Sequence, residues 1–535
     1  MKVAVIGSGP AGISCTQGLL KRGVQVDMLD VGETLDPSRR QLIADLRTRP
    51  FADWKRAEIA RITENVSFES DGVPRRRYFG SEFVFASERD RAPIELIDTN
   101  LVPTYAKGGY STIWGASMLP VAESDIDAWP IRRNALEPYY RNLMREMPLS
   151  TAPSGIEAVF PSYRKSAELI PFPAQCEKLL ARMERHRDAL SGKGVLFGRS
   201  RLAVRAAGIE SDGESEGGCI SCGLCHYGCV PNAIYSTVEV LERLKTQPGF
   251  RYLDKTMARS VTERSDGVVI EAMAGGATMP PARYDAVFLA LGALNTTRVM
   301  LDMLDLDGQD VMLLDSEKAI VPFLTSWNTP AASDERKPAL PGIFFLFRGP
   351  AETDRWAHAQ IYAVNDTMLT RLGIDPFGPP QWRRKLLAPL LNRVMVAWVG
   401  LHSDLSGKLA VRLNKAENRF VIRGLKSEAA AREMRRTAWK LFRLGLRFGG
   451  IFVPPAMIAG LPGASHHVGG SFPMRAAPRT RLETDIWGRP AGRRRVFAVD
   501  ATILPSIPAT TITLTAMANA QRIGAEAPLE FGAAP

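Results

Sequence analysis

The N-terminal segment restricts the fold class more than any other part of the chain. Lys2 to Ile6 is a short apolar run that predicts a strand, and the hexad Gly7-Ser8-Gly9-Pro10-Ala11-Gly12 and a helix-like segment follow it. A second apolar run ends at Asp30, 18 residues beyond Gly12. This order of strand, glycine loop, helix, strand and acid is typical of a Rossmann-type α/β unit that binds a dinucleotide.

The glycine positions explain the spacing of this motif. Gly7 allows a tight turn, Gly9 lets a pyrophosphate approach the backbone, and Gly12 lets the helix and the strand pack closely. Asp30 can accept hydrogen bonds from ribose hydroxyls. The pattern predicts a bound dinucleotide, and it leaves FAD and NAD open as its identity.

The composition is that of a folded globular chain. Its 535 residues leave room for about two to four domains, and 45% hydrophobic with 23% charged residues exclude a disordered or collagen-like protein. The net charge of +11 is a weak signal over this length, and no nucleic-acid-binding motif accompanies it. Because an apolar strand begins at Lys2, no secretory signal is recognised and we expect a cytoplasmic protein.

Further segments, in a consistent order along the chain, resemble the glucose-methanol-choline (GMC) family of FAD oxidoreductases. The run Lys107-Gly108-Gly109-Tyr110-Ser111-Thr112-Ile113-Trp114-Gly115 is similar to a family segment whose backbone lies against the flavin and its phosphates. Glycines suit such a position because a side chain would block the approach. The resemblance therefore implies that Gly108, Gly109 and Ser111 bind the cofactor.

The resemblance continues in the second half of the chain. The segment 284–291, followed by Gly292, is similar to the family's later strand and glycine turn beside the cofactor. The segment 496–502, which contains Asp500 and Ala501, and the segment 513–518 resemble the closing strand and helix over the flavin. The resemblance thus implies that Asp500 and Ala501 also contact FAD.

These matches imply a fold class and a domain organisation. The expected fold is α/β, with a Rossmann-type FAD-binding domain and an α+β substrate domain that contains an antiparallel sheet. The FAD-binding domain is expected to combine residues 1–150, 211–310, which also carry a cysteine cluster, and 463–535, which carry the catalytic histidine. Residues 151–210 would connect it to a substrate-binding domain at 311–462.

The catalytic prediction concerns two adjacent histidines. His467 to Met474 resembles the family segment His-x-x-Gly-x-x-x-Met, whose histidine faces the reactive edge of the flavin. A neutral imidazole can take a hydroxyl proton while the carbinol hydride leaves for the flavin. The resemblance makes His467 the candidate base, with His466 as the alternative in the adjacent register.

A threonine departs from the family pattern. The family places a second His or Asn near the substrate hydroxyl, and this position falls on Thr511. A threonine hydroxyl can hydrogen-bond a substrate oxygen, but it cannot act as a base near neutral pH. We expect Thr511 to contact the substrate, and the usual pair of catalytic residues is in doubt.

A cluster of cysteines points to a metal. Cys219, Cys222, Cys225 and Cys229 have the spacing C-x2-C-x2-C-x3-C, which is that of a ferredoxin-type iron–sulfur run. Disulfides fit poorly in a chain expected to stay in the cytoplasm, whereas zinc also suits four thiolates. We expect a [3Fe–4S] or [4Fe–4S] cluster, and zinc or a metal-free loop stays open. The acidic segment 211–218 before it is expected to be an exposed loop.

The cysteine cluster implies one branch of the resembling family, the FAD catalytic subunits of bacterial sugar dehydrogenases. That resemblance implies a dehydrogenase that oxidises an alcohol of a sugar or polyol, transfers hydride to flavin and relays electrons through the cluster to a cytochrome, a ferredoxin or a quinone. Two alternatives stay open, and Thr511 in place of the family's His or Asn motivates the first of them. One is a flavin and Fe–S reductase or desaturase acting on a different substrate, such as a lipid-linked one, and the other is a non-catalytic electron-transfer flavoprotein subunit.

The middle of the chain predicts a sheet and two amphipathic segments. Alternating residues at 342–347, 357–364 and 394–401 predict strands of an antiparallel sheet. Basic and apolar residues share the segments 432–448 and 376–391. We expect the first to be a helix that faces the core, with a membrane-binding basic face as the alternative. For the second, peripheral contact with the inner face of a membrane is an alternative that stays open.

Overall fold

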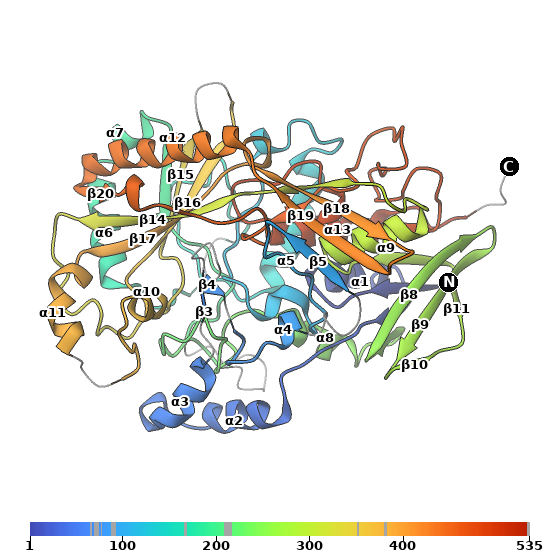
Figure 1. Ribbon diagram of the computed structural model, residues 1–535, viewed down its shortest axis with the longest axis horizontal. Helices are drawn as coiled ribbons and strands as arrows, with labels where there is room; N and C mark the ends of the chain where they lie inside the picture. The colour runs from blue at the N-terminus through green and yellow to red at the C-terminus, as the bar shows by residue number, and fades with distance from the viewer. Residues whose placement is uncertain are drawn as a thin grey trace.

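The computed structural model describes residues 1–64, 67–68, 74–75, 77–86, 93–164, 168–207, 217–349, 353–378 and 382–531 (Figure 1). Residues 211–216 of the predicted acidic loop and residues 379–381 of the second amphipathic segment lie outside these ranges.

Five parallel strands form the sheet at the nucleotide end. Their order is β23 (Val496–Ala498), β12 (Ala286–Leu289), β1 (Lys2–Ile6), β2 (Gln25–Leu29) and β7 (Phe250–Leu253). The strands are short apolar runs, as expected where both faces of a parallel sheet are covered. Segments from the beginning, middle and end of the chain therefore present their strand ends at one edge. The predicted α/β class with a Rossmann-type domain is confirmed.

The first and last long helices of this domain pack against each other. They are α1 (Pro10–Leu20) and α13 (Thr513–Glu526). A Cβ on Gly18 would lie 2.6 Å from the carbonyl oxygen of Gln521, and a Cβ on Gly524 would lie 2.3 Å from that of Cys15. Glycine at both positions lets the helix backbones approach closely, which brings the two ends of the chain to the same site.

A large antiparallel sheet forms the second half of the molecule. Its order is β20 (Gly450–Phe452), β14 (Lys318–Thr325), β17 (Val394–Gly400), β16 (Trp356–Tyr362), β15 (Ile343–Arg348) and β6 (Val195–Arg199), with β21 (Ile458–Ala459) also paired to β14. Strands β15, β16 and β17 confirm the three strands predicted from alternation, with small shifts at their ends.

Helices α12 (Glu428–Gly445) and α6 (Ala174–Arg185) bury their apolar residues in the core on one face of this sheet. Met434, Leu441 and Leu444 of α12 join Phe323 and Phe345 of the sheet there, and Figure 1 shows α12 lying along the strands. The prediction of a core-facing helix at 432–448 is confirmed. Because side chains alternate along a strand, the neighbours of these core residues point to the opposite face.

A third sheet joins the two halves. Its order is β22 (Val468–Gly469), β13 (Val311–Asp315), β18 (Lys408–Asn414), β19 (Arg419–Leu425) and β5 (Ile94–Ile97). Strand β13 leads directly into β14 of the large sheet, and β22 follows the two histidines. Their pairing, with Asp315 opposite Val468, places the histidine loop beside the start of β14.

The remaining helices and strands of the described ranges lie outside these three sheets and the helices named above. The helices are α2 (Pro37–Arg47), α3 (Arg56–Thr63), α4 (Phe83–Ala86), α5 (Arg133–Glu146), α7 (Arg187–Ser191), α8 (Thr237–Leu244), α9 (Ala293–Met303), α10 (Asp366–Arg371) and α11 (Trp382–Leu391), and the strands are β3 (Ser67–Phe68), β4 (Pro74–Arg75), β8 (Thr256–Arg264), β9 (Gly267–Ala274), β10 (Ala277–Thr278) and β11 (Ala282–Tyr284). No helix in the described ranges combines the length and the apolar character needed to cross a bilayer.

Candidate functional site

The glycine loop has the geometry that its sequence predicts. Gly7 adopts a φ of +105°, and a Cβ there would lie 2.5 Å from the carbonyl oxygen of Ala290. A Cβ on Gly12 would lie 1.9 Å from the carbonyl oxygen of Gly7, so helix α1 can sit this close only with glycine. A Cβ on Gly9 would meet only Gly109, at 3.9 Å. Gly9 therefore faces open space, as an approaching pyrophosphate requires.

Asp30 is held at the end of β2 by two donors. The hydroxyls of Ser8 and Tyr252 both donate to its Oδ2, the latter at 3.0 Å. Neither contact uses Oδ1, which is available to a ribose hydroxyl. Burial raises the pKa of Asp30 to about 6. Sequence reasoning missed both donors, although Ser8 lies within the glycine motif.

We expect FAD affinity to rise with pH up to about 6, because ribose hydroxyls donate to the carboxylate form of Asp30. Below that pH the empty site is protonated, so binding must release a proton, and each pH unit there changes affinity up to about tenfold. Asp30→Asn should weaken binding and remove this slope. Fluorescence titration of apoprotein with FAD at several pH values measures the affinity, and Asp53→Asn, a change of an exposed aspartate, is the control. An unchanged slope in Asp30→Asn would show that another group titrates.

The Gly108 loop is tied to the glycine hexad. The Gly108 amide donates to Ser8 Oγ at 2.9 Å. Ser111 Oγ donates to the Gly108 carbonyl at 2.6 Å and accepts from the Thr237 amide at 3.1 Å. Ser111 is buried and does not line the adjoining cavity. Its hydroxyl therefore shapes the loop against α8, and Thr237, which the sequence reasoning missed, shares this role.

Asp500 links the C-terminal segment to the turn after β12. Its Oδ2 accepts hydrogen bonds from the Gly292 amide at 2.9 Å and from Thr296 Oγ1 at 2.5 Å, and its Oδ1 accepts from the Thr502 amide at 2.9 Å. Burial raises the pKa of Asp500 above its ordinary value. This carboxylate fixes the two segments that the sequence predicted to lie beside the cofactor.

A cavity of about 500 Å³ lies where these segments meet. Of the residues predicted to bind the cofactor, it is lined by Gly7, Gly9, Asp30, Gly109, Asp500 and Ala501. Gly12, Gly108 and Ser111 lie behind the lining and support it. The volume is within the range of cofactor sites.

The residues of this cavity fit FAD. The open space at Gly9, the uncommitted oxygen of Asp30 and the close approach of two glycine loops match the needs of a diphosphate and a ribose. Tyr110, His466 and Thr513 line the same cavity. FAD, when bound, supplies a two-electron acceptor at this position.

The two histidines point to different surroundings. His466 lines the cavity, and its ring centroid lies 5.0 Å from that of Tyr110. His467 does not line it, and its buried Nδ1 has no hydrogen-bond partner among the described residues. Burial and the charge of Lys318 lower the pKa of His467 well below its ordinary value. His467 is therefore a neutral imidazole at neutral pH.

A buried carboxylate holds the loop that carries His467. Asp315 accepts hydrogen bonds from the Gly463 amide at 2.7 Å and from Ser465 Oγ at 3.1 Å. The same Ser465 hydroxyl accepts from the His467 amide at 2.9 Å, and the Ser316 amide donates to the His467 carbonyl at 3.1 Å. The backbone of His467 is thus fixed on both sides, which suits a residue that must keep one orientation.

Thr511 is buried next to this region. Its Oγ1 accepts a hydrogen bond from the Leu119 amide at 3.2 Å, and the residue does not line the cavity. The hydroxyl proton has no acceptor among the described residues, so contact with a substrate oxygen stays a prediction.

The cysteine loop packs on helices α2 and α3. Cys222 belongs to a hydrophobic cluster with Leu46 and Ile62, while Cys219, Cys225 and Cys229 pack against the main core. All four are free thiols. Burial, together with the charges of the other three thiols, raises the pKa of Cys225 well above its ordinary value. The four sulfurs are therefore close enough to influence one another electrostatically.

The described side chains do not support the predicted metal cluster. Within the described ranges, no three His, Cys, Asp or Glu side chains gather in an arrangement that could hold a metal ion. Cys229 Sγ instead accepts a hydrogen bond from the Ala233 amide at 3.1 Å, and His226 is bound through Nδ1 to Asp366 at 3.0 Å. The arrangement does not fit a metal or a cluster as it stands.

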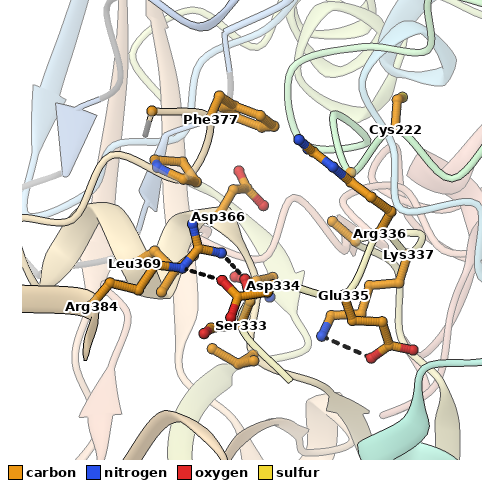
Figure 2. Close-up of a pocket in the computed structure, with 16 residues that line it drawn as sticks. Cys222, Ser333, Asp334, Glu335, Arg336, Lys337, Asp366, Leu369, Phe377 and Arg384 are labelled. Atoms are coloured by element: carbon orange, nitrogen blue, oxygen red, sulfur yellow. Dashed lines mark hydrogen bonds and ion pairs between the residues drawn. The ribbon is translucent and has the colours of Figure 1, made fainter. Parts of the chain in front are cut away.

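A smaller polar cavity of about 190 Å³ borders Cys222 (Figure 2). Its charged groups largely neutralise one another, since Arg384 pairs with Asp334 at 2.9 Å and Lys337 with Glu335 at 3.2 Å. This cavity has no surplus of either charge that would select a ligand.

Comparison with known proteins finds a solved structure with a similar fold. No protein-family model matches the chain, and neither does any curated protein sequence. Among solved structures, pyridoxine 4-oxidase from Mesorbium loti matches with a TM-score of 0.59 and 15% sequence identity, over 98% of each chain. The chain therefore shares its whole architecture with that oxidase.

Proposed function

We propose that this protein binds FAD and oxidises the CH–OH group of an alcohol, as a member of the GMC type. The observation that carries the proposal is the cavity in which Gly9, Asp30 and Asp500 converge and which His466, the residue before His467, also lines. The shared fold with an oxidase named for acting on pyridoxine supports it. The order of the sequence motifs supports FAD rather than NAD.

We infer that His467 is the base of this reaction. Its neutral ring takes the hydroxyl proton of the substrate alcohol. FAD bound in the cavity would supply the acceptor for the carbinol hydride. The C–O bond becomes C=O, and the two electrons leave with the hydride. Asp315 keeps the loop that carries His467 in place.

The experiment that tests this function starts from the purified protein. FAD released by heat should be stoichiometric with the chain, and a redox dye should be reduced with some member of a panel of primary alcohols, pyridoxine, sugars and polyols. A protein that binds no flavin would contradict the proposal. A flavoprotein that oxidises nothing in the panel but takes electrons from a partner protein would indicate the non-catalytic alternative.

Substrate and acceptor are narrower proposals. A sugar or polyol is favoured by the resemblance to bacterial sugar dehydrogenases, and pyridoxine by the name of the structural neighbour. Dioxygen, a cytochrome, a ferredoxin and a quinone are the acceptors to compare. Hydrogen peroxide formed in stoichiometric amounts would identify an oxidase.

The spacing of Cys219, Cys222, Cys225 and Cys229 supports an electron relay, which would require the thiols to rearrange from the arrangement described above. Iron and sulfide analysis of anaerobically purified protein tests it. Three or four irons per chain, with as many or more sulfides, would mean that the thiols rearrange around a cluster. Flavin without iron would leave the loop a structural one.

A membrane contact at α11 is supported by exposed apolar residues. Trp382, Leu386 and Leu390, spaced four residues apart, are 69%, 68% and 43% exposed, and Arg383 and Lys385 lie between them. Such a helix can lie in the interface of a bilayer, at the cytoplasmic face if the chain remains in the cytoplasm.

We expect the protein to sediment with vesicles that contain anionic lipid, and Trp382→Ser with Leu386→Ser to abolish this binding, because the apolar anchor is lost. Trp439→Ser, a change of another exposed tryptophan, serves as control. Equal sedimentation of all three proteins would contradict the contact.

A further inference from the structure

Three facing positions form a row across the large sheet. Lys318 of β14 lies opposite Gly400 of β17, and Gly400 lies opposite His358 of β16. Residues directly opposite on paired strands share one face of a sheet. The next residues, Ala319 and Ala359, belong to the core on the α12 side, so the row faces the other way.

Gly400 makes room for the amine of Lys318. A Cβ on Gly400 would lie 2.2 Å from Lys318 Nζ and 2.7 Å from the carbonyl oxygen of Ala509. Lys318 Nζ instead donates to that carbonyl at 2.5 Å. An ammonium has three N–H donors, and this is the one partner of Lys318 Nζ among the described residues. Two donors therefore remain uncommitted.

The groups around Lys318 are also incompletely bonded. His358 is 1% exposed, and its Nε2 has no hydrogen-bond partner among the described residues. The same holds for Nδ1 of His467 and for Oγ1 of Thr510, the residue after Ala509. Buried polar groups in proteins are normally paired, so this concentration of unpaired ones indicates a place where a polar ligand binds.

The pKa shifts of His358 and His467 also indicate that both histidines lie near Lys318. The charge of Lys318 lowers the pKa of both His358 and His467, after burial as the larger cause. Burial lowers the pKa of Lys318 to about 7, although Asp315 opposes this shift. Two neutral imidazoles and a lysine beside them suit an oxygen atom that gains negative charge.

We propose that Lys318, with His358, binds the oxygen atom of the substrate alcohol and stabilises the negative charge that develops on it. This inference rests on the proposed function. The position of the family's second His or Asn falls on Thr511, and Lys318 would be the second polar group that contacts the substrate oxygen. Lys318 donates a hydrogen bond to the oxygen and His467 receives the hydroxyl proton, while FAD, when bound, would accept the hydride from carbon. Lys318 keeps all its protons throughout this step.

The first test is Lys318→Met, which has nearly the same shape and carries no charge. Loss of one such donor should lower kcat by about 10²–10³-fold, with KM changed little and FAD content unaltered. The alcohol used is the one found with the wild-type panel. A Lys318→Met enzyme with full FAD content and kcat within about twofold of wild type would overturn the proposal.

The second test separates chemistry from folding. Lys318→Ala leaves a space for a small amine, so ethylammonium in the assay should restore turnover in a saturable manner, whereas tetramethylammonium, which has no N–H donor, should not. Lys318→Met, whose side chain fills the space, should not respond to ethylammonium. Failure of rescue in a Lys318→Ala protein that retains FAD would contradict the role of Lys318.

A third variant covers the case in which both changes at Lys318 lose FAD. Gly400→Ala keeps the lysine and displaces its amine. A lower kcat with FAD retained supports the inference, and an unchanged kcat overturns it. If the wild-type protein binds no FAD or oxidises no alcohol, it is the proposed function that fails.

Discussion

His467→Gln is expected to lower the rate of alcohol oxidation by about 10²–10⁴-fold, the usual contribution of a general base. Glutamine keeps the size and polarity of the side chain but cannot take a proton. FAD should still bind, because His467 does not line the cofactor cavity. Steady-state kinetics with flavin quantified in each preparation measure the effect.

Two control variants make this result specific. His186→Gln changes an exposed histidine after α6 and should leave the rate unchanged. His466→Gln removes a ring that contacts Tyr110 at the cavity lining and should weaken FAD binding more than it slows chemistry. The reverse pattern, with His466→Gln losing turnover and His467→Gln retaining it, would assign the base to His466.

Gly12→Ala should have the largest effect on the folded protein. Its Cβ would lie 1.9 Å from a backbone oxygen of Gly7, so helix α1 must move away from the glycine loop. We expect a loss of about 3 kcal/mol in the free energy of unfolding, at the upper end of ordinary overpacking, and loss of bound FAD. Urea unfolding and flavin content measure the two effects.

Gly192→Ala is the matched control for this change. Gly192 has a helical φ of −62°, and a Cβ there would lie 3.4 Å from the Asp188 carbonyl oxygen, an ordinary contact. That variant should retain both stability and flavin. Full FAD content in Gly12→Ala would contradict the account of how α1 and the glycine loop pack.

The nucleotide half of the molecule was predictable because its signals are local. Gly7, Gly9, Gly12 and Asp30 lie within one strand–helix–strand unit, and each has a steric or hydrogen-bonding reason for its position. The strands of the large sheet were also predictable, since alternation of side chains persists along β15 and β16.

The contacts around Lys318 could not be predicted from the sequence. Lys318, His358, Gly400 and His467 are far apart along the chain, and only strand register and the pairing of β13 with β22 bring them together. The cysteine run is the opposite case, because the sequence predicted a site that the structure does not support. Its spacing indicates a cluster, yet the described residues do not form a metal site, because spacing does not determine where each thiol points.

Anaerobic rapid mixing of the purified flavoprotein with its alcohol substrate tests the central claim most directly. The claim is that the cavity of about 500 Å³ holds FAD within reach of a base that removes the hydroxyl proton. We predict that the absorbance of the bound oxidised flavin disappears in a single turnover, and that it persists on the same timescale in His467→Gln. Flavin that no alcohol in the panel reduces, although dithionite does, would contradict the account.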